Sequence, residues 1–282
     1  MVFGHEAGFS NTSGSRNSFF GNDSGHANLT GINNSFFGND SGKLNTSGRD
    51  NCFFGISSGE NNISGGNNSF FGESSGLRNS EGTDNSFYGN ASGNNNTTGR
   101  HNSYFGKSSG FLAQGSGNLI LGRGAGPTSA NSDINLRLFI DVDTSSSPGG
   151  NDEPLIYGEF DNDFVRINGT FEVTAGLSNP SSRDLKHEFV DLEATEILDK
   201  IGRIEVRQWS YKQRPGEIHV GPVAEDFYEL FGLGEGNTKI STIDADGVMM
   251  LAIQALKDEN EQLKAKLDEQ EKLIAQILEK LE

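Results

Sequence analysis

Aromatic residues recur at a fixed interval through residues 1–126 of the chain. Phe3 begins the series, and Leu121 ends it after a step that is one position shorter than the others. Between them the second aromatic of each pair recurs every 17 residues, at Phe20, Phe37, Phe54, Phe71, Tyr88 and Phe105. Each Ser-Phe-Phe segment, or close variant, is flanked by stretches rich in Gly, Asn and Ser, which are typical of turns. The interval predicts a short strand and two turns in every repeat.

A single 17-residue repeat, with one or two aromatics, cannot bury a core by itself. Stacked units can do so, with aromatic on aromatic and Asn ladders at the corners. Glycines at fixed offsets supply the positive φ angles that such corners need. We therefore expect residues 1–126 to form a β-solenoid or a trimeric β-roll. The array is similar to the Asn-Ser-Phe-Phe-Gly-rich repeats of tail-fibre shafts and trimeric autotransporter heads.

Residues 127–180 change in composition and predict a β-rich neck. Apolar segments at 136–142, 155–160, 164–169 and 170–174 are expected strands, and an Asp-Asn-Asp turn separates the middle two. The segment has little apolar content for a free monomer, so three intertwined copies are the more plausible arrangement.

Residues 181–248 have the pattern of a small α+β domain. Helices are expected at 194–201 and 224–231, and strands at 204–211 and 219–223. The fold class is thus mainly β, with a stacked-repeat region, a β neck, this α+β domain and a helical C-terminus.

Residues 249–282 carry a heptad pattern of apolar residues with Glu and Lys on the flanks, as in a coiled coil. The a positions are Ile253, Asn260, Leu267, Ile274 and Leu281, and the d positions are Met249, Leu256, Leu263, Gln270 and Ile277. The polar Asn260 and Gln270 would fix the register. The alternative interpretation is one amphipathic helix packed on its own domain.

Charge and cysteine content narrow the possible partners and cofactors. The net charge is −17, of which residues 1–126 contribute about −1 and residues 127–282 about −16. An acidic surface repels phosphate, so nucleic acid and anionic membranes are unsuitable partners. The single Cys52 excludes an internal disulfide. Asp23 and Asp40 could ligate calcium, but turn chemistry is the better interpretation, and we expect no metal or cofactor.

The C-terminal third contains six short blocks in a recognisable order. They are Ser181-Ser-Arg-Asp-Leu-Lys186, Trp209-Ser-Tyr211, His219-Val-Gly-Pro-Val-Ala-Glu-Asp-Phe227, Phe231-Gly-Leu-Gly, Ile240-Ser-Thr-Ile-Asp-Ala-Asp-Gly247 and Ala252-Ile-Gln-Ala-Leu. Together they resemble the endosialidase-type intramolecular chaperone domain found at the C-terminus of phage tail spikes and tail fibres. The resemblance implies a homotrimer whose C-terminal domain guides folding of the β fibre and then releases itself by cutting its own chain.

The same resemblance implies a set of processing residues. In the family a Ser followed five positions later by a Lys begins the domain, which corresponds to Ser181 and Lys186 and places the cut between Pro180 and Ser181. The lysine amine would take the hydroxyl proton. His219 corresponds to a family histidine that matters for the reaction. Ser182 remains a second candidate nucleophile, and a plain helix-capping role for Ser181 is the alternative.

These observations favour a trimeric, tail-fibre-like or adhesin-like structural protein with a self-assembling C-terminus. It would belong to a phage tail or a cell-surface appendage, with a surface glycan or receptor as its partner. No signal peptide or membrane-spanning segment is visible in the sequence. Two alternatives remain: a solenoid with a cleavage-dead trimerisation tail, and a glycan-depolymerising tail spike.

Overall fold

The computed structural model describes residues 1–129, 132–142, 153–174, 179–212, 215–234 and 236–280. The chain divides into two compact units, Met1–Leu177 and Ser178–Glu282. The first is built from β-strands, and the second contains all of the described α-helices. The expected mainly β fold with a C-terminal helix is confirmed.

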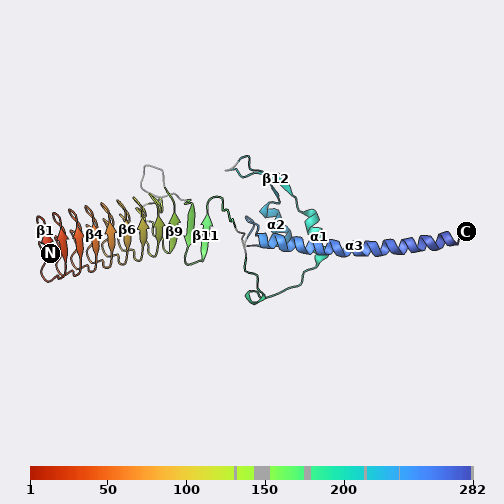
Figure 1. The fold of residues 1–282 in the computed structure, drawn as a ribbon, viewed down its shortest axis with the longest axis horizontal. Coiled ribbons are helices and arrows are strands. Elements are labelled where there is room, and N and C mark those ends of the chain that lie inside the picture. Colours follow the sequence, from red (N-terminus) through yellow and green to blue (C-terminus); the bar gives the residue numbers. More distant parts are fainter. Residues whose placement is uncertain (130–131, 143–152, 175–178, 213–214, 235, 281–282) are drawn as a thin grey trace. The chain divides into compact units, whose positions relative to one another are not determined.

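The repeat array is a single-chain β-solenoid. Each short strand pairs in parallel with the next strand of the same chain, so the coils stack one after another (Figure 1). The eight solenoid strands in the described residues are β1 (Val2–Phe3), β2 (Ser18–Phe20), β3 (Ser35–Phe37), β4 (Cys52–Phe54), β5 (Ser69–Phe71), β6 (Ser86–Tyr88), β7 (Ser103–Phe105) and β8 (Leu119–Leu121).

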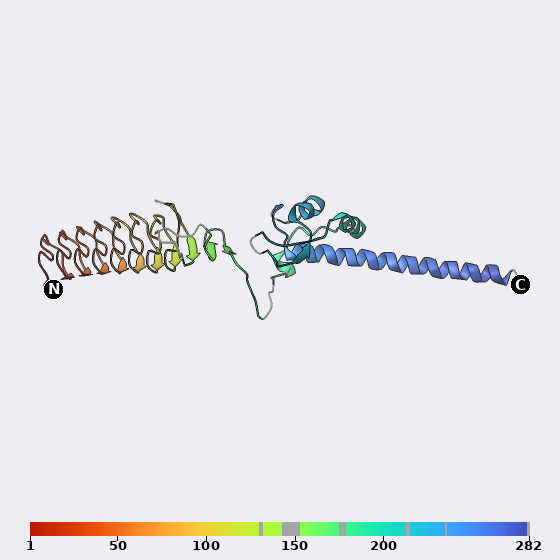
Figure 2. The same ribbon diagram turned by 90° about the horizontal axis from the view of Figure 1, so that it is seen from above.

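Each coil from β2 to β7 contributes one aromatic to the inside of the solenoid and one to its surface. The strand register pairs Phe36 with Phe53 and Phe37 with Phe54, and the same step recurs along the array (Figure 2). The inner rings, Phe19 to Tyr104, are at most 1% exposed and stack at 4.7–5.2 Å between centroids. The outer rings are only partly covered. Stacked aromatic pairs contribute beyond their buried area, so both ladders hold neighbouring coils together.

Three further columns inside the solenoid are polar and buried. In one, each Asn side chain donates to the Asn side-chain oxygen of the preceding coil, as Asn62 does to Asn45 at 2.7 Å. In the second, a backbone N–H is satisfied by an Asn of the preceding coil, as Asn68 is by Asn51 at 3.0 Å. In the third, Ser hydroxyls such as Ser58 donate to a backbone carbonyl of the next coil. Buried polar groups cost little when they are paired in this way.

One column of glycines makes room for the inner rings. Gly59 has φ of +58°, and a Cβ there would collide with the ring of Phe53 in its own coil. The equivalent glycine of each neighbouring coil has the same conformation. Both the left-handed backbone and the packed ring therefore require glycine.

The neck continues the same sheet. Strand β9 (Arg137–Ile140) pairs in parallel with β8, and β10 (Ile156–Glu159) and β11 (Phe164–Ile167) follow as antiparallel neighbours. Phe139 is buried against the edge of Tyr157, with ring centroids 5.4 Å apart. The strand expected at 170–174 is absent from the described residues, because β11 is the last strand of the ladder and the following segment finds no partner there.

The C-terminal unit has a small helical core beside a two-stranded sheet. Its elements are η1 (Arg183–Leu185), α1 (Ala194–Arg203), β12 (Arg207–Trp209), β13 (His219–Gly221), α2 (Ala224–Phe231) and α3 (Thr242–Glu279). Ile197 of α1, Phe227 of α2 and Val248 of α3 form the buried cluster. Helix α2 is followed by its C-cap Gly232, which has a left-handed backbone (φ +64°) and whose N–H donates to the carbonyl of Tyr228.

Helix α3 is one continuous element that begins at Thr242, ahead of the first heptad position at Met249. Its buried residues, Val248, Ala252 and Ala255, all lie in its first half. The part of α3 nearest its N-terminus therefore packs on its own unit, and the following turns show no buried residues among those described.

Candidate processing site and assembly surface

A single 3₁₀ turn brings Ser181 and Lys186 together. The chain enters η1 at Ser182 and leaves it at Lys186, whose backbone N–H bonds to the carbonyl of Arg183. This reversal places the two side chains on the same side of the turn. The Lys186 Nζ donates a hydrogen bond of 2.7 Å to the Ser181 Oγ. A serine and an amine in direct contact form a nucleophile and base pair of the kind used in acyl transfer.

The neighbouring Ser182 is engaged differently. It is the N-cap of η1, and its Oγ accepts a bond from the backbone N–H of Asp184 at 3.3 Å. Its hydroxyl is thus directed to the turn, whereas that of Ser181 is directed to Lys186. The structure thus gives Ser182 the capping role and leaves the Ser181 hydroxyl in contact with Lys186.

Pro180, Ser181 and Lys186 are all exposed to solvent in the single chain. A lysine amine becomes an effective base where its charged form is desolvated. Water around the Ser181–Lys186 pair provides no such desolvation. The contact between Ser181 and Lys186 is therefore made within one chain, at a solvent-exposed position.

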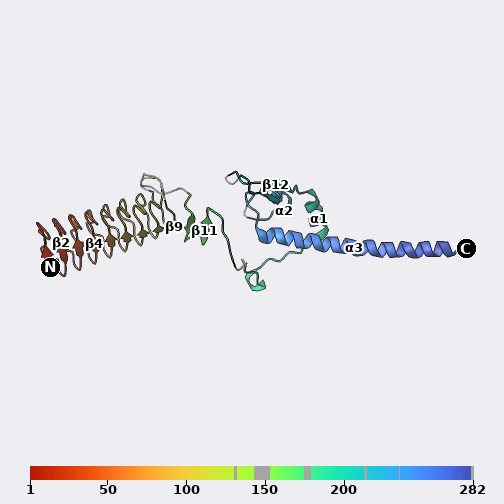
Figure 3. The same ribbon diagram turned by 45° about the horizontal axis from the view of Figure 1, so that its top comes forward.

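His219 lies in a separate aromatic cluster. Strand register pairs it with Trp209, and the two rings stack at 4.8 Å between centroids. Tyr211 closes the cluster at 5.5 Å from His219. Among the described residues no hydrogen bond or ring contact joins His219 to Ser181 or Lys186. Element η1 and strand β12 lie on opposite sides of α3 in Figures 1 and 3. Within one chain, Ser181 and Lys186 are thus in contact, whereas His219 lies elsewhere.

Trp209 and Tyr211 are candidate functional residues to which sequence reasoning gave no role. Their alternation along an extended segment was the available signal, because it puts both rings on one face. The Trp209 Nε1 and the His219 Nε2 are buried atoms without a hydrogen-bond partner among the described residues. Both rings therefore keep a polar atom that remains to be satisfied. A pocket beside them is lined by Trp209, Tyr211, Pro222 and Glu225, among others.

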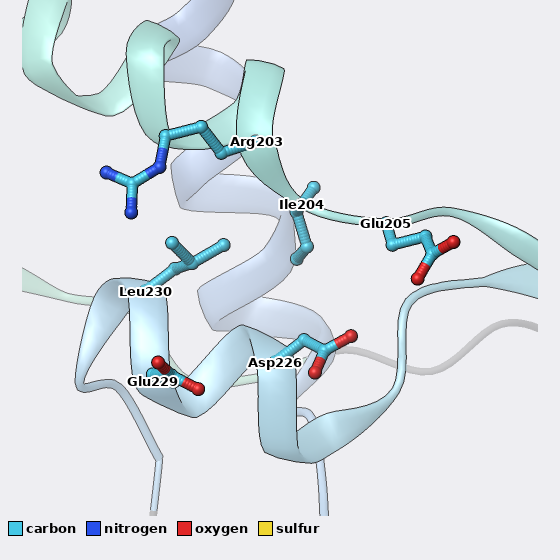
Figure 4. A pocket seen from close by; sticks show the side chains of 6 residues that line it. All are labelled: Arg203, Ile204, Glu205, Asp226, Glu229 and Leu230. Atoms are coloured by element: carbon cyan, nitrogen blue, oxygen red, sulfur yellow. The ribbon is translucent and has the colours of Figure 1, made fainter.

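A second pocket lies between α1 and α2 and is shown in Figure 4. Its lining comprises Arg203, Ile204, Glu205, Asp226, Glu229 and Leu230. The lining holds three carboxylates, one guanidinium and two aliphatic side chains, so the pocket is acidic overall. None of the sequence-predicted processing residues lines it, and it carries no nucleophile.

The predicted trimer-core residues form an exposed apolar stripe along α3. Ile253, Leu256, Leu263, Leu267, Ile274 and Ile277 are between 49% and 65% exposed. Asn260 is also exposed, and Leu281 lies outside the described residues. Scattered exposed apolar residues are normal on a surface, but apolar residues that recur along one face over this length are typical of an interaction site.

Among the described residues no helix has the length and apolar character that crossing a bilayer requires. Comparison of the sequence with protein families finds one whose description is chaperone of endosialidase, and its match covers residues 181–232. The match thus contains η1, α1, the β12–β13 sheet and α2. Comparison with curated proteins and with solved structures gives no match. We conclude that the C-terminal unit carries an intramolecular chaperone domain of the endosialidase type, placed after a β-solenoid.

Proposed function

We propose that this chain is a trimeric, tail-fibre-like structural protein whose C-terminal chaperone assembles the trimer and then detaches by self-cleavage. A β-solenoid followed by an endosialidase-type chaperone domain fits a structural protein of this kind, and the family suggests association with a phage tail. The observation that carries the proposal is the apolar stripe of α3, which no other part of the described chain covers. In this proposal residues 1–126 are the shaft or head, 127–180 the neck, 181–248 the chaperone and 249–282 the coiled coil.

Three copies of α3 would cover one another's stripes. Leu263, Leu267 and Ile274 continue the stripe far beyond the helical turns that pack on the chain's own unit. Burying a leucine side chain contributes about 1.5–3 kcal/mol, so six such positions in each helix supply a large driving force for association. The exposed Asn260, at an a position, would restrict the register of the three helices.

The repeats give a physical reason for needing a chaperone. Successive coils present almost the same residues at every step, so many offsets between chains would give similar contacts. A trimer formed first at the C-terminus would align the three chains before their solenoids pack. Cell-surface glycan or receptor binding would then fall to the exposed side chains of the solenoid.

The self-cleavage step would use the Ser181–Lys186 pair. The Ser181 Oγ attacks the carbonyl carbon of Pro180, the lysine amine takes the hydroxyl proton, and that proton passes to the departing backbone nitrogen of Ser181. The Pro180–Ser181 amide breaks as an ester forms to the Ser181 Oγ. Water then hydrolyses the ester, which leaves a carboxylate on Pro180 and a free amine on Ser181. The scissile bond is adjacent to the nucleophile, so no substrate pocket is needed.

Assembly would supply the desolvation that the single chain lacks. Ser181 and Lys186 are exposed in one copy, and a neighbouring chain packed over η1 would remove water from the ammonium. Cleavage would then follow assembly rather than precede it. His219 enters this proposal only through the family resemblance, since it lies beside Trp209 and Tyr211.

Intact mass under denaturing conditions tests cleavage. The uncut chain has a mass of 30.3 kDa. Wild-type protein should give two fragments that meet at Pro180 and Ser181, whereas Ser181→Ala and Lys186→Met should stay whole. Ser182→Ala is the matched control and should still be cut. Intact wild-type protein would overturn self-cleavage and leave the cleavage-dead trimerisation tail as the function.

Molar mass in solution tests trimer formation independently. The Ser181→Ala variant should elute as a species of three chains by light scattering, and adding Leu263→Glu and Ile277→Glu should reduce it to one. Glu261→Gln and Glu271→Gln on the polar flank form the control. A monomeric Ser181→Ala protein would contradict trimer formation, even if the wild-type protein cuts its own chain.

A further inference from the structure

Lys43 joins the carboxylates of two successive coils. Its Nζ lies 2.9 Å from the Asp23 Oδ2 and 2.8 Å from the Asp40 Oδ1. The two aspartates occupy equivalent positions in neighbouring repeats, and both have a left-handed backbone, with φ of 54° and 56°. Stacking puts like charges side by side in neighbouring coils, which is unfavourable without compensation. Lys43 supplies the compensating positive charge.

One coil earlier the equivalent position carries a histidine in place of the lysine. Glu6 occupies the position of Asp23 in the preceding coil, with φ of 51°. His26 precedes Lys43 by one repeat and contacts the carboxylate of Glu6. The His26 Nδ1 lies 3.4 Å from the Glu6 Oε2. That nitrogen is buried and has no hydrogen-bond partner among the described residues.

His5 completes the group. One ligand atom from each of His5, Glu6 and Asp23 lies within 4.8 Å of the others. His5 and Glu6 are exposed, so their side chains can rotate toward a common centre. Lys43 contacts the Oδ2 of Asp23, which leaves the second carboxylate oxygen to face another ligand. These three side chains offer one imidazole and two carboxylates from two adjacent coils, and His26 adds a second imidazole through its contact with Glu6.

We propose that His5, Glu6, Asp23 and His26 bind one divalent transition-metal ion of the Zn²⁺ class. Imidazole nitrogen together with carboxylate oxygen suits Zn²⁺, Co²⁺ or Ni²⁺, whereas Ca²⁺ and Mg²⁺ prefer oxygen alone. The ion would take the place between Glu6 and Asp23 that the Lys43 ammonium takes between Asp23 and Asp40. It would link the first two coils of the solenoid and stabilise them, because an unfolded chain does not hold the four ligands together.

Titration of tag-free, full-length protein with Zn²⁺ tests the site, with Co²⁺ as a spectroscopic probe. We expect one ion per chain and the visible absorption of four-coordinate Co²⁺. His26→Ala and His5→Ala should each weaken binding at least about tenfold, because loss of a supporting residue alone commonly costs that much. The control is His101→Ala, since His101 lies on the same solenoid, 3.7 Å from Asp84, and should leave binding unchanged.

A second variant separates metal binding from loss of fold. His26→Lys reproduces the arrangement of Lys43, so it should abolish Zn²⁺ binding while the solenoid remains as stable without metal as wild type, or more so. In wild type, Zn²⁺ should raise the melting temperature of the β signal, and in His26→Lys it should not. Equal Zn²⁺ affinity in wild type, His26→Ala and His101→Ala, or no binding at one ion per chain, would overturn the proposal.

Discussion

The solenoid and the C-terminal unit differ in which residues pack against, and hydrogen-bond to, their side chains. In the solenoid, the residue that covers Phe53 is the equivalent residue of the next coil, Phe70, and the group that pairs Asn62 is the equivalent group of the coil before. In the C-terminal unit, three buried residues from three helices form the small core, and the apolar stripe of α3 stays exposed. The solenoid also carries almost no net charge, whereas most of the −17 lies beyond it.

This difference separates two kinds of stability. A coil contacts only its neighbours, so the solenoid gains stability step by step along one chain. The C-terminal unit presents Leu263, Leu267 and Ile277 to solvent, and those residues gain free energy only when another surface covers them. In a single copy the inner ladder of the solenoid is thus buried, whereas the apolar stripe of α3 is exposed.

Removing an inner ring should have the largest effect. Phe53 is fully buried between Phe36 and Phe70. We expect Phe53→Ala to lower the free energy of unfolding by about 3–5 kcal/mol, because it leaves a cavity in the ladder. Phe54→Ala, in the half-exposed outer ladder of the same coil, should cost clearly less. Denaturant unfolding followed by circular dichroism measures both, and equal costs would contradict the division into inner and outer ladders.

A Gly→Ala exchange should have opposite signs in the two units. Gly59→Ala places a Cβ against the Phe53 ring at φ of +58°, so it should destabilise the solenoid by about 1–3 kcal/mol. Gly202 lies exposed in α1 with nothing within 4 Å of an added Cβ. Gly202→Ala should stabilise the C-terminal unit by roughly 0.5–1 kcal/mol through helix propensity. Thermal unfolding of both variants checks the signs, and a destabilised Gly202→Ala would contradict the helix assignment.

Cutting the Asn ladder should have a similar or smaller cost. Asn62→Ala leaves the buried Asn45 Oδ1 without its donor. The expected loss is about 1–3 kcal/mol, the usual cost of one unsatisfied buried group. The neighbouring Asn61 is half-exposed, so Asn61→Ala should change stability by less than about 0.5 kcal/mol. The same denaturant titration compares the two, and similar values would mean that the ladder does not stabilise the coil.

The smallest expected effect is a pH dependence at Lys43. A hydrogen bond from Lys43 holds the pKa of Asp23 below its ordinary value. A lowered folded-state pKa gives stability that is present above the unfolded value, near about 4, and is lost as the pH falls through the folded value. The melting temperatures of wild type and Lys43→Met should therefore differ at pH 7 and converge under more acidic conditions. A difference independent of pH would show that Lys43 acts through packing alone.

Much of the solenoid could be predicted because its contacting residues are separated by the same interval in the sequence throughout the array. The constant step placed every strand from Ser18 to Phe105, since each residue packs on its equivalent one coil away. Helix α2 also begins at Ala224 and ends at Phe231 as its pattern predicts. The prediction of a strand at 170–174 was wrong because local β-propensity does not supply a pairing partner.

The sequence by itself determined the repeat, the positions of most helices and strands, the apolar stripe of α3 and the presence of Ser181 five positions before Lys186. Only the tertiary structure decided which aromatic of each pair is buried, that Ser182 caps η1 while Ser181 meets Lys186, and that His219 joins Trp209 instead. It also brought His5 and Glu6 beside Asp23, and His26 beside Glu6. The reason is that periodic spacing and helix propensity are local properties, whereas the direction of a side chain depends on how distant segments close around it.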